Sequence, residues 1–126
     1  AMVTYFQGAF VADEQAVISV RSRGLNYGLG CFGGIRGYLA DDGKQVFVFR
    51  LEDHIRRLEQ SCKVLYLRLP SDVATVSKLV LELLVRNDVH YDVYVRPMVF
   101  SNSVKMAPVL REEDSELTIY SLPLQR

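Results

Sequence analysis

The order of apolar and polar positions predicts strands towards both ends of the chain and a pair of helices between them. β-branched and aromatic residues concentrate in seven short runs, several of which alternate apolar with polar positions. The runs are residues 3–6, 8–11, 16–20, 32–38, 45–50, 92–100 and 116–122. Residues 41–44 separate two of these runs and predict a hairpin turn, because Asp and Gly tolerate positive φ.

Two segments between these runs repeat apolar residues at helical spacing. Residues 51–65 carry an apolar residue every three or four positions, which places one apolar stripe along a helix. A second helix is expected to start after Pro70, where Ser71 or Asp72 can cap free N–H groups, and to run to residue 87. Strands on both sides of a helix pair favour an α+β fold, an antiparallel sheet with two helices packed on one face.

The overall composition is that of one globular domain. The chain has 126 residues, of which 49% are hydrophobic and 24% charged, enough to bury an ordinary core. The chain has Lys+Arg 15 and Asp+Glu 15, so its formal net charge is zero. A chain without net charge gives no general electrostatic reason to expect a nucleic acid or an anionic membrane as partner. No apolar run approaches the roughly 20 residues that span a bilayer, and no secretion signal is recognisable at the N-terminus. We therefore expect a cytoplasmic protein with no membrane partner.

The cysteines give no indication of a disulfide or a metal. Cys31 and Cys62 are too distant in the sequence for a C-x-x-C redox or zinc pair. Only the two histidines, His54 and His90, are available as further metal ligands of the kind that zinc sites use. We expect buried, reduced thiols and no metal site.

Six of the eight glycines lie close together, at positions 24, 28, 30, 33, 34 and 37. Such a density indicates that another group approaches the backbone there. Residues 28–33 read G-x-G-x-x-G, but the next glycines disfavour the helix that a dinucleotide site needs, and Ile35 and Tyr38 favour a strand. In a strand, Phe32, Arg36 and Tyr38 share one face. A glycine-rich bulge and a ligand site are then both open interpretations.

Several motifs in register resemble the class IV (fold type IV) pyridoxal-phosphate aminotransferases, and most closely the branched-chain amino acid aminotransferases. They are RGLNYGLGCF at 23–32, GIRGY at 34–38, VFRLEDHIRRL at 48–58, SCK at 61–63 and YVRP at 94–97. The resemblance covers nearly the whole chain. It implies that residues 1–126 form the family's N-terminal small domain, an open antiparallel sheet with two helices, which covers the cofactor pyridoxal 5'-phosphate (PLP).

The resemblance also implies the activity of an intact enzyme. That enzyme, a homodimer, transfers an amino group between a branched-chain L-amino acid and 2-oxoglutarate, and its C-terminal domain supplies the lysine that holds the cofactor. No such domain is part of these 126 residues. The four lysines, at positions 44, 63, 78 and 105, do not match the family's catalytic lysine motif. We therefore expect the chain alone to be catalytically inactive.

Two neighbouring arginines receive different roles from the resemblance. Arg57 is similar to the arginine that binds the cofactor phosphate, for which a guanidinium offers a planar fork of donors. Arg56 is instead expected to be a solvated helix charge. His54 is expected to be a structural, hydrogen-bonded histidine, and the role of Arg36, similar to a family arginine, stays open between ligand and structural pairing.

The remaining site residues come from strands and from the glycine-rich segment. Tyr94 and Arg96 match the Tyr-x-Arg-Pro strand that contributes to recognition of the substrate carboxylate, and their spacing puts them on one face. Phe32 and Tyr38 match residues that line the hydrophobic side-chain pocket. Tyr27 matches a residue that reaches the active site of the partner subunit.

Two departures from the family pattern leave the amino donor open. Gly33 stands where the family usually has Glu, and residues 101–108 stand where a more glycine-rich loop contacts substrate in relatives. D-amino acid or (R)-amine transamination and aminodeoxychorismate lysis therefore remain alternatives. So does a protein of another class, a stand-alone, non-catalytic module that dimerises or binds a phosphorylated ligand through Arg57.

Overall fold

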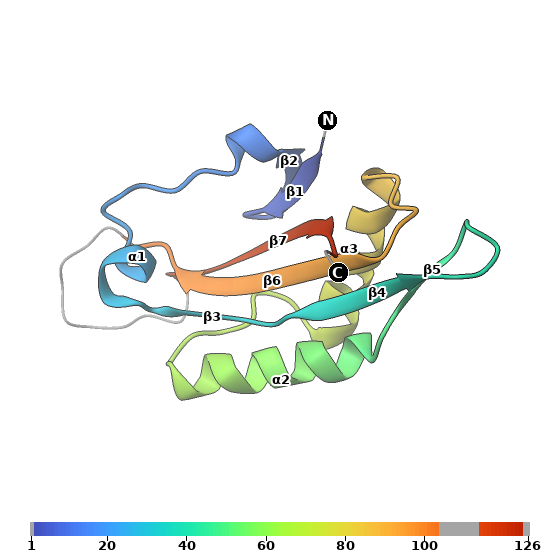
Figure 1. The fold of residues 1–126 in the computed structure, drawn as a ribbon. Coiled ribbons are helices and arrows are strands. Elements are labelled where there is room, and N and C mark those ends of the chain that lie inside the picture. Colours follow the sequence, from blue (N-terminus) through green and yellow to red (C-terminus); the bar gives the residue numbers. More distant parts are fainter. Residues whose placement is uncertain (1, 104–113, 125–126) are drawn as a thin grey trace.

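One antiparallel sheet organises the computed structural model, which describes residues 2–103 and 114–124 (Figure 1). Its strands are β1 (Val3–Phe6), β2 (Ala9–Ala12), β3 (Gly30–Phe32), β4 (Ile35–Leu39), β5 (Val46–Val48), β6 (Val93–Ser101) and β7 (Ser115–Pro123). They lie in the order β2-β1-β7-β6-β4-β5, with β3 also paired to β6, and each of these pairings is antiparallel. The predicted hairpin turn lies between β4 and β5.

Two long helices, α2 (Leu51–Val64) and α3 (Val73–Arg86), cover one face of the sheet. α2 packs against β3, and α3 packs against β1 and β7. The core between the layers consists of fully buried aliphatic side chains from helices and strands: Ile35, Ile55, Val76, Val80, Leu83, Val93, Val95, Val99 and Ile119. This arrangement confirms the predicted α+β fold with two helices on one face. Among the described helices, none has the length and apolar character needed to cross a membrane.

Polar side chains fix both ends of α3. Asp72, one of the two expected capping residues, accepts a hydrogen bond from the backbone N–H of Thr75 at 2.7 Å. At the other end, the Asn87 amide oxygen accepts from the Val3 backbone N–H at 2.8 Å, and its nitrogen donates to the Val3 carbonyl at 3.1 Å. These two bonds attach the end of α3 to the start of β1.

The prediction of a strand at residues 16–20 is wrong. A short 3-10 helix, η1 (Asp13–Gln15), precedes this segment, which then runs without a strand partner. Val17 and Val20 are 69% and 79% exposed. Strand propensity describes how well a side chain fits a pleated, half-buried surface, so a β-branched run without a neighbouring strand does not form one.

The glycine-rich segment begins with a short helix that the apolar pattern did not predict, α1 (Arg23–Tyr27). Its C-cap is Gly28, whose φ of 63° is left-handed and therefore suits glycine. Gly24 permits close packing on β6, since a Cβ there would lie 3.0 Å from the Ser101 carbonyl oxygen. The strand β3 starts inside the G-x-G-x-x-G pattern, which confirms that this is not a dinucleotide-binding turn.

The single strand predicted at residues 32–38 is divided at two glycines. β3 ends at Phe32 and β4 begins at Ile35, with Gly33 and Gly34 between them. The Gly33 N–H still donates to the Pro97 carbonyl at 3.0 Å, so this backbone stays attached to β6. The division leaves two glycines between β3 and β4.

Candidate functional site

The loop formed by Gly33 and Gly34 closes a small cavity against α2. The cavity has a volume of about 150 Å³. Its lining consists of Phe32, Gly33 and Gly34 from the sheet and His54, Arg57, Leu58 and Ser61 from the helix. We call it the Arg57 cavity. His54, Arg57 and Ser61 are spaced three and four residues apart, so they share the helix face that meets the glycines.

Ion pairing distinguishes the two arginines of this helix. Arg56 donates to Glu52 at 3.1 Å and to Asp53 at 3.4 Å, and it is the surface charge expected from the sequence. Arg57, within residues 2–103 and 114–124, makes no ion pair. No Asp or Glu belongs to the lining of the Arg57 cavity. The positive charge of Arg57 is therefore available to an anion.

His54 also lines this cavity, a placement that the sequence analysis did not assign to it. Partial burial lowers the pKa of His54, and the nearby charges of Arg57 and Arg50 lower it further. A neutral imidazole is therefore favoured, and it can donate or accept a hydrogen bond at the wall of the cavity. The described residues offer no group of three or more His, Cys, Asp or Glu that could hold a metal ion.

The electrostatic link between His54 and Arg57 can be measured. We expect the pKa of His54 to rise in the Arg57→Ala variant, because removing a neighbouring cation makes the imidazolium less unfavourable. Arg56→Ala is the matched control and should leave this pKa unchanged, since Arg56 is not among the groups that shift it. The measurement is an NMR titration of the imidazole protons of the chain's two histidines. A pKa that does not respond to Arg57→Ala would contradict the assigned geometry.

A second arginine lies on the sheet face that α2 and α3 leave open. The Nε and Nη2 atoms of Arg96 donate to the Tyr94 hydroxyl at 3.4 and 3.1 Å. Its guanidinium carbon lies 4.2 Å from the centre of the Phe32 ring. The bonds to Tyr94 raise the pKa of Arg96 further, with a smaller contribution from Tyr120. Arg96 is thus a permanent cation that stacks on the ring of Phe32.

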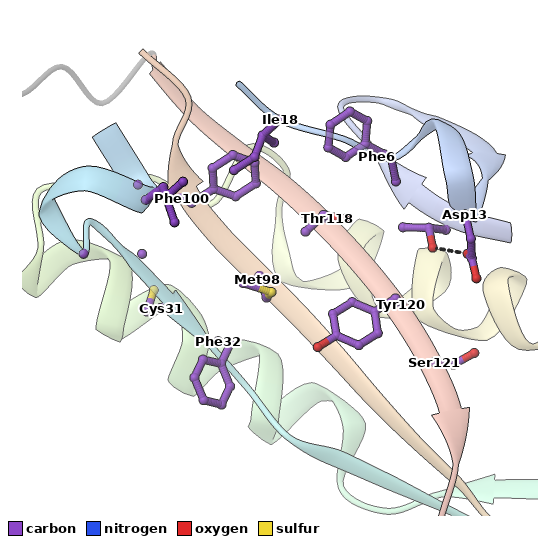
Figure 2. A pocket seen from close by; sticks show the side chains of 16 residues that line it. Phe6, Asp13, Ile18, Cys31, Phe32, Met98, Phe100, Thr118, Tyr120 and Ser121 are labelled. Carbon is purple, nitrogen blue, oxygen red and sulfur yellow. Dashed lines mark hydrogen bonds between the residues drawn. The ribbon is translucent and has the colours of Figure 1, made fainter. Parts of the chain in front are cut away.

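A larger, mostly apolar cavity of about 580 Å³ lies on the same face, and we call it the open-face cavity. The sheet supplies its floor, and residues between Asp13 and Gly28 supply the opposite wall. Figure 2 shows the side chains that line it along β3, β6 and β7, among them Phe32, Met98 and Tyr120. Phe32 therefore lines both cavities and also stacks against Arg96.

The structure brings some of the expected site residues together and leaves others apart. Phe32 contacts Arg96 and lines the Arg57 cavity, although Arg57 and Arg96 line no common cavity of the two described. Tyr38 lies on β4 opposite Phe47 and lines neither cavity. Tyr27 lies on α1, half exposed, and belongs to neither lining.

The expectation for the substrate loop concerns mainly residues that the structure does not describe. Of residues 101–108, those from 104 onwards lie outside the described residues, as does Lys105. Like His54, Ser61 lines the Arg57 cavity without having been expected there from the sequence. It follows Arg57 by four positions, and this helical spacing was the signal that could have identified it.

Comparison with known proteins gives the family of the chain. The profile of the family "Amino-transferase class IV" matches residues 30–126. A probable branched-chain-amino-acid aminotransferase of Synechocystis sp. is 31% identical over 123 residues, covering 97% of this chain and 40% of the relative. The chain thus spans less than half the length of this curated relative.

Solved structures show the same similarity. The branched-chain aminotransferase of Thermoproteus uzoniensis with norvaline superposes with a TM-score of 0.89 at 33% identity, over 99% of this chain and 41% of that one. The T.th. branched-chain amino acid aminotransferase with pyridoxamine 5'-phosphate gives a TM-score of 0.84 at 29% identity, with 99% and 41% covered. On the match to residues 30–126, the chain belongs to the class IV aminotransferase family.

Proposed function

We propose that this chain is the N-terminal domain of a PLP-dependent branched-chain amino acid aminotransferase, and that the intact enzyme transfers an amino group between a branched-chain L-amino acid and 2-oxoglutarate. The observation that carries this proposal is the Arg57 cavity, whose lining contains an arginine without an ion pair among the described residues and no carboxylate. The names of the relatives support the substrate class.

The residues of the Arg57 cavity fit a phosphate group. Arg57 offers a guanidinium, Ser61 a hydroxyl and His54 an imidazole, while no carboxylate competes in the lining. Gly33 and Gly34 belong to the same lining. One similar solved structure holds pyridoxamine 5'-phosphate, which supports PLP as the ligand. When bound, PLP supplies an electron sink that stabilises negative charge at the substrate α-carbon.

The open face fits an amino acid with an aliphatic side chain. Arg96 uses two of its donors on Tyr94, which leaves further N–H groups for a carboxylate. Phe32 and Met98 supply apolar surface in the open-face cavity. An anion-binding group beside apolar surface is the recognition pattern that a branched-chain amino acid requires.

The lysine of the reaction is proposed to come from another part of the protein. Lys63 and Lys78 line neither the Arg57 cavity nor the open-face cavity, and Lys44 lies in the β4–β5 turn. We also propose that the enzyme is a cytoplasmic homodimer, in which the exposed Tyr27 reaches the site of the partner subunit.

The test is an amino-transfer assay on the product of the complete reading frame. We expect L-leucine, L-isoleucine and L-valine to be converted to 2-oxo acids in the presence of PLP and 2-oxoglutarate, with the 126-residue chain alone as an inactive control. Preference for a D-amino acid or an (R)-amine, or lyase activity on aminodeoxychorismate, would overturn the substrate class. A reading frame that stops at Arg126 would favour the non-catalytic module, and turnover by the chain alone would overturn the external lysine.

A further inference from the structure

The two cysteines lie in contact, although 31 positions separate them in the sequence. Cys31 is on β3 and Cys62 is on α2, and their sulfur atoms are 3.7 Å apart. Both are free thiols. A disulfide has a sulfur–sulfur distance of about 2.05 Å, so side-chain rotation with a small approach of β3 towards α2 would join them.

The environments of the two thiols differ. Cys62 is fully buried in the core, whereas Cys31 is partly exposed and belongs to the lining of the open-face cavity. The hydrogen bond between them lowers the pKa of Cys31 and raises the pKa of Cys62, and burial raises that of Cys62 further. Cys31 is therefore the thiol that ionises first and meets a small solute first.

We propose that Cys31 and Cys62 form a reversible disulfide on reaction with hydrogen peroxide, with Cys31 as the attacking thiol and Cys62 as the resolving thiol. In the first step the Cys31 thiolate attacks one peroxide oxygen, the O–O bond breaks, and the departing oxygen leaves as water with the thiol proton. Cys31 is now a sulfenic acid. In the second step the Cys62 sulfur attacks the Cys31 sulfur, the S–O bond breaks, and the departing hydroxide takes the Cys62 thiol proton and leaves as a second water. Two thiols lose two electrons, and hydrogen peroxide gains them.

The crosslink would join the two walls of the Arg57 cavity. Phe32 directly follows Cys31, and Ser61 directly precedes Cys62, and both of these neighbours line the cavity. The disulfide therefore fixes β3 against α2 at the edge of that cavity. The effect on cofactor binding rests on the proposed function, whereas formation of the bond does not.

The test uses the 126-residue chain itself. Cys31 and Cys62 are its two cysteines, so any intramolecular disulfide must join them. After treatment with hydrogen peroxide and alkylation, we expect loss of both free thiols, a monomeric product lighter by two hydrogen atoms, and full recovery with dithiothreitol. A non-reduced peptide map should join the peptides that contain Cys31 and Cys62. Retention of both thiols, accumulation of sulfinic acid at Cys31, or covalent dimers as the main product would overturn the proposal.

Single variants assign the two roles. In Cys62→Ala, dimedone should trap the sulfenic acid at Cys31, because no resolving thiol remains. In Cys31→Ala, the buried Cys62 should react at least about tenfold more slowly than Cys31 does. Equal reactivity of the two thiols would overturn the assignment of Cys31 as the attacking group. The wild-type mass measurement remains decisive if either variant folds poorly.

Discussion

Replacing Arg57 with alanine is expected to weaken PLP binding by the full-length protein about tenfold to a hundredfold, the loss that follows removal of a charge-assisted hydrogen bond worth about 1.5–3 kcal/mol. The reason is geometric. Arg57 is the cation in the lining of the Arg57 cavity, and no carboxylate of that lining neutralises it. Calorimetric or fluorescence titration with PLP gives the dissociation constant.

The neighbouring arginine provides the matched control for this substitution. Arg56→Ala removes the same charge from the adjacent position, but Arg56 is already paired with Glu52 and Asp53 at the surface. We therefore expect its PLP affinity to stay within about twofold of wild type. Pyridoxal, which lacks the phosphate, should bind equally to wild type and to Arg57→Ala. Equal PLP affinity of the two arginine variants would contradict the assignment of Arg57 to the phosphate.

The parts of the fold with strong periodicity could be predicted from the sequence. Residues 51–65 and 92–100 were expected as a helix and a strand, and the structure has α2 (Leu51–Val64) and β6 (Val93–Ser101) at these places. Both elements are long enough for the period to be unambiguous, and both bury one face in the core. In both elements the local conformational preference agrees with the burial of one face, and the two predictions were therefore correct.

The prediction failed where tertiary partners decide the structure. Residues 16–20 have the composition of a strand, but no strand pairs with them. The helix α1 could not be predicted from local preference, because it contains glycine, a poor helix former. Contact between Cys31 and Cys62 was also unpredictable, because sequence distance contains no information on how β3 packs against α2.

The candidate site was partly accessible from the sequence. The family motifs pointed to Arg57 and Arg96, but the cavity around Arg57 depends on where β3 ends and β4 begins. Phe32 and Ile35, on either side of Gly33 and Gly34, pair with Met98 and Val95 of β6, and only the assembled sheet shows that the strand is divided between them. The stacking of Arg96 on Phe32 likewise comes from the register of β3 against β6, in which Phe32 is opposite Met98.

Replacing Arg96 with alanine is expected to lower kcat/KM for a branched-chain amino acid by about a hundredfold in the full-length enzyme, with most of the loss in KM. Arg96 makes no ion pair within the part of the chain that the structure describes, so its charge is available to the substrate carboxylate. Steady-state kinetics with L-leucine as donor measure the effect. An unchanged KM would contradict this role.

The adjacent glycines test whether the position of Arg96 matters as well as its charge. A Cβ at Gly34 would lie 2.6 Å from the Tyr94 hydroxyl, so Gly34→Ala must displace the group that accepts both Arg96 hydrogen bonds. A Cβ at Gly33 would meet only the Pro97 ring, at 3.6 Å, an ordinary contact. We expect Gly34→Ala to raise KM about tenfold, the effect of misplacing a substrate-positioning group, and Gly33→Ala to change it less than about twofold. Equal effects of the two substitutions would mean that Tyr94 does not position Arg96 for the substrate.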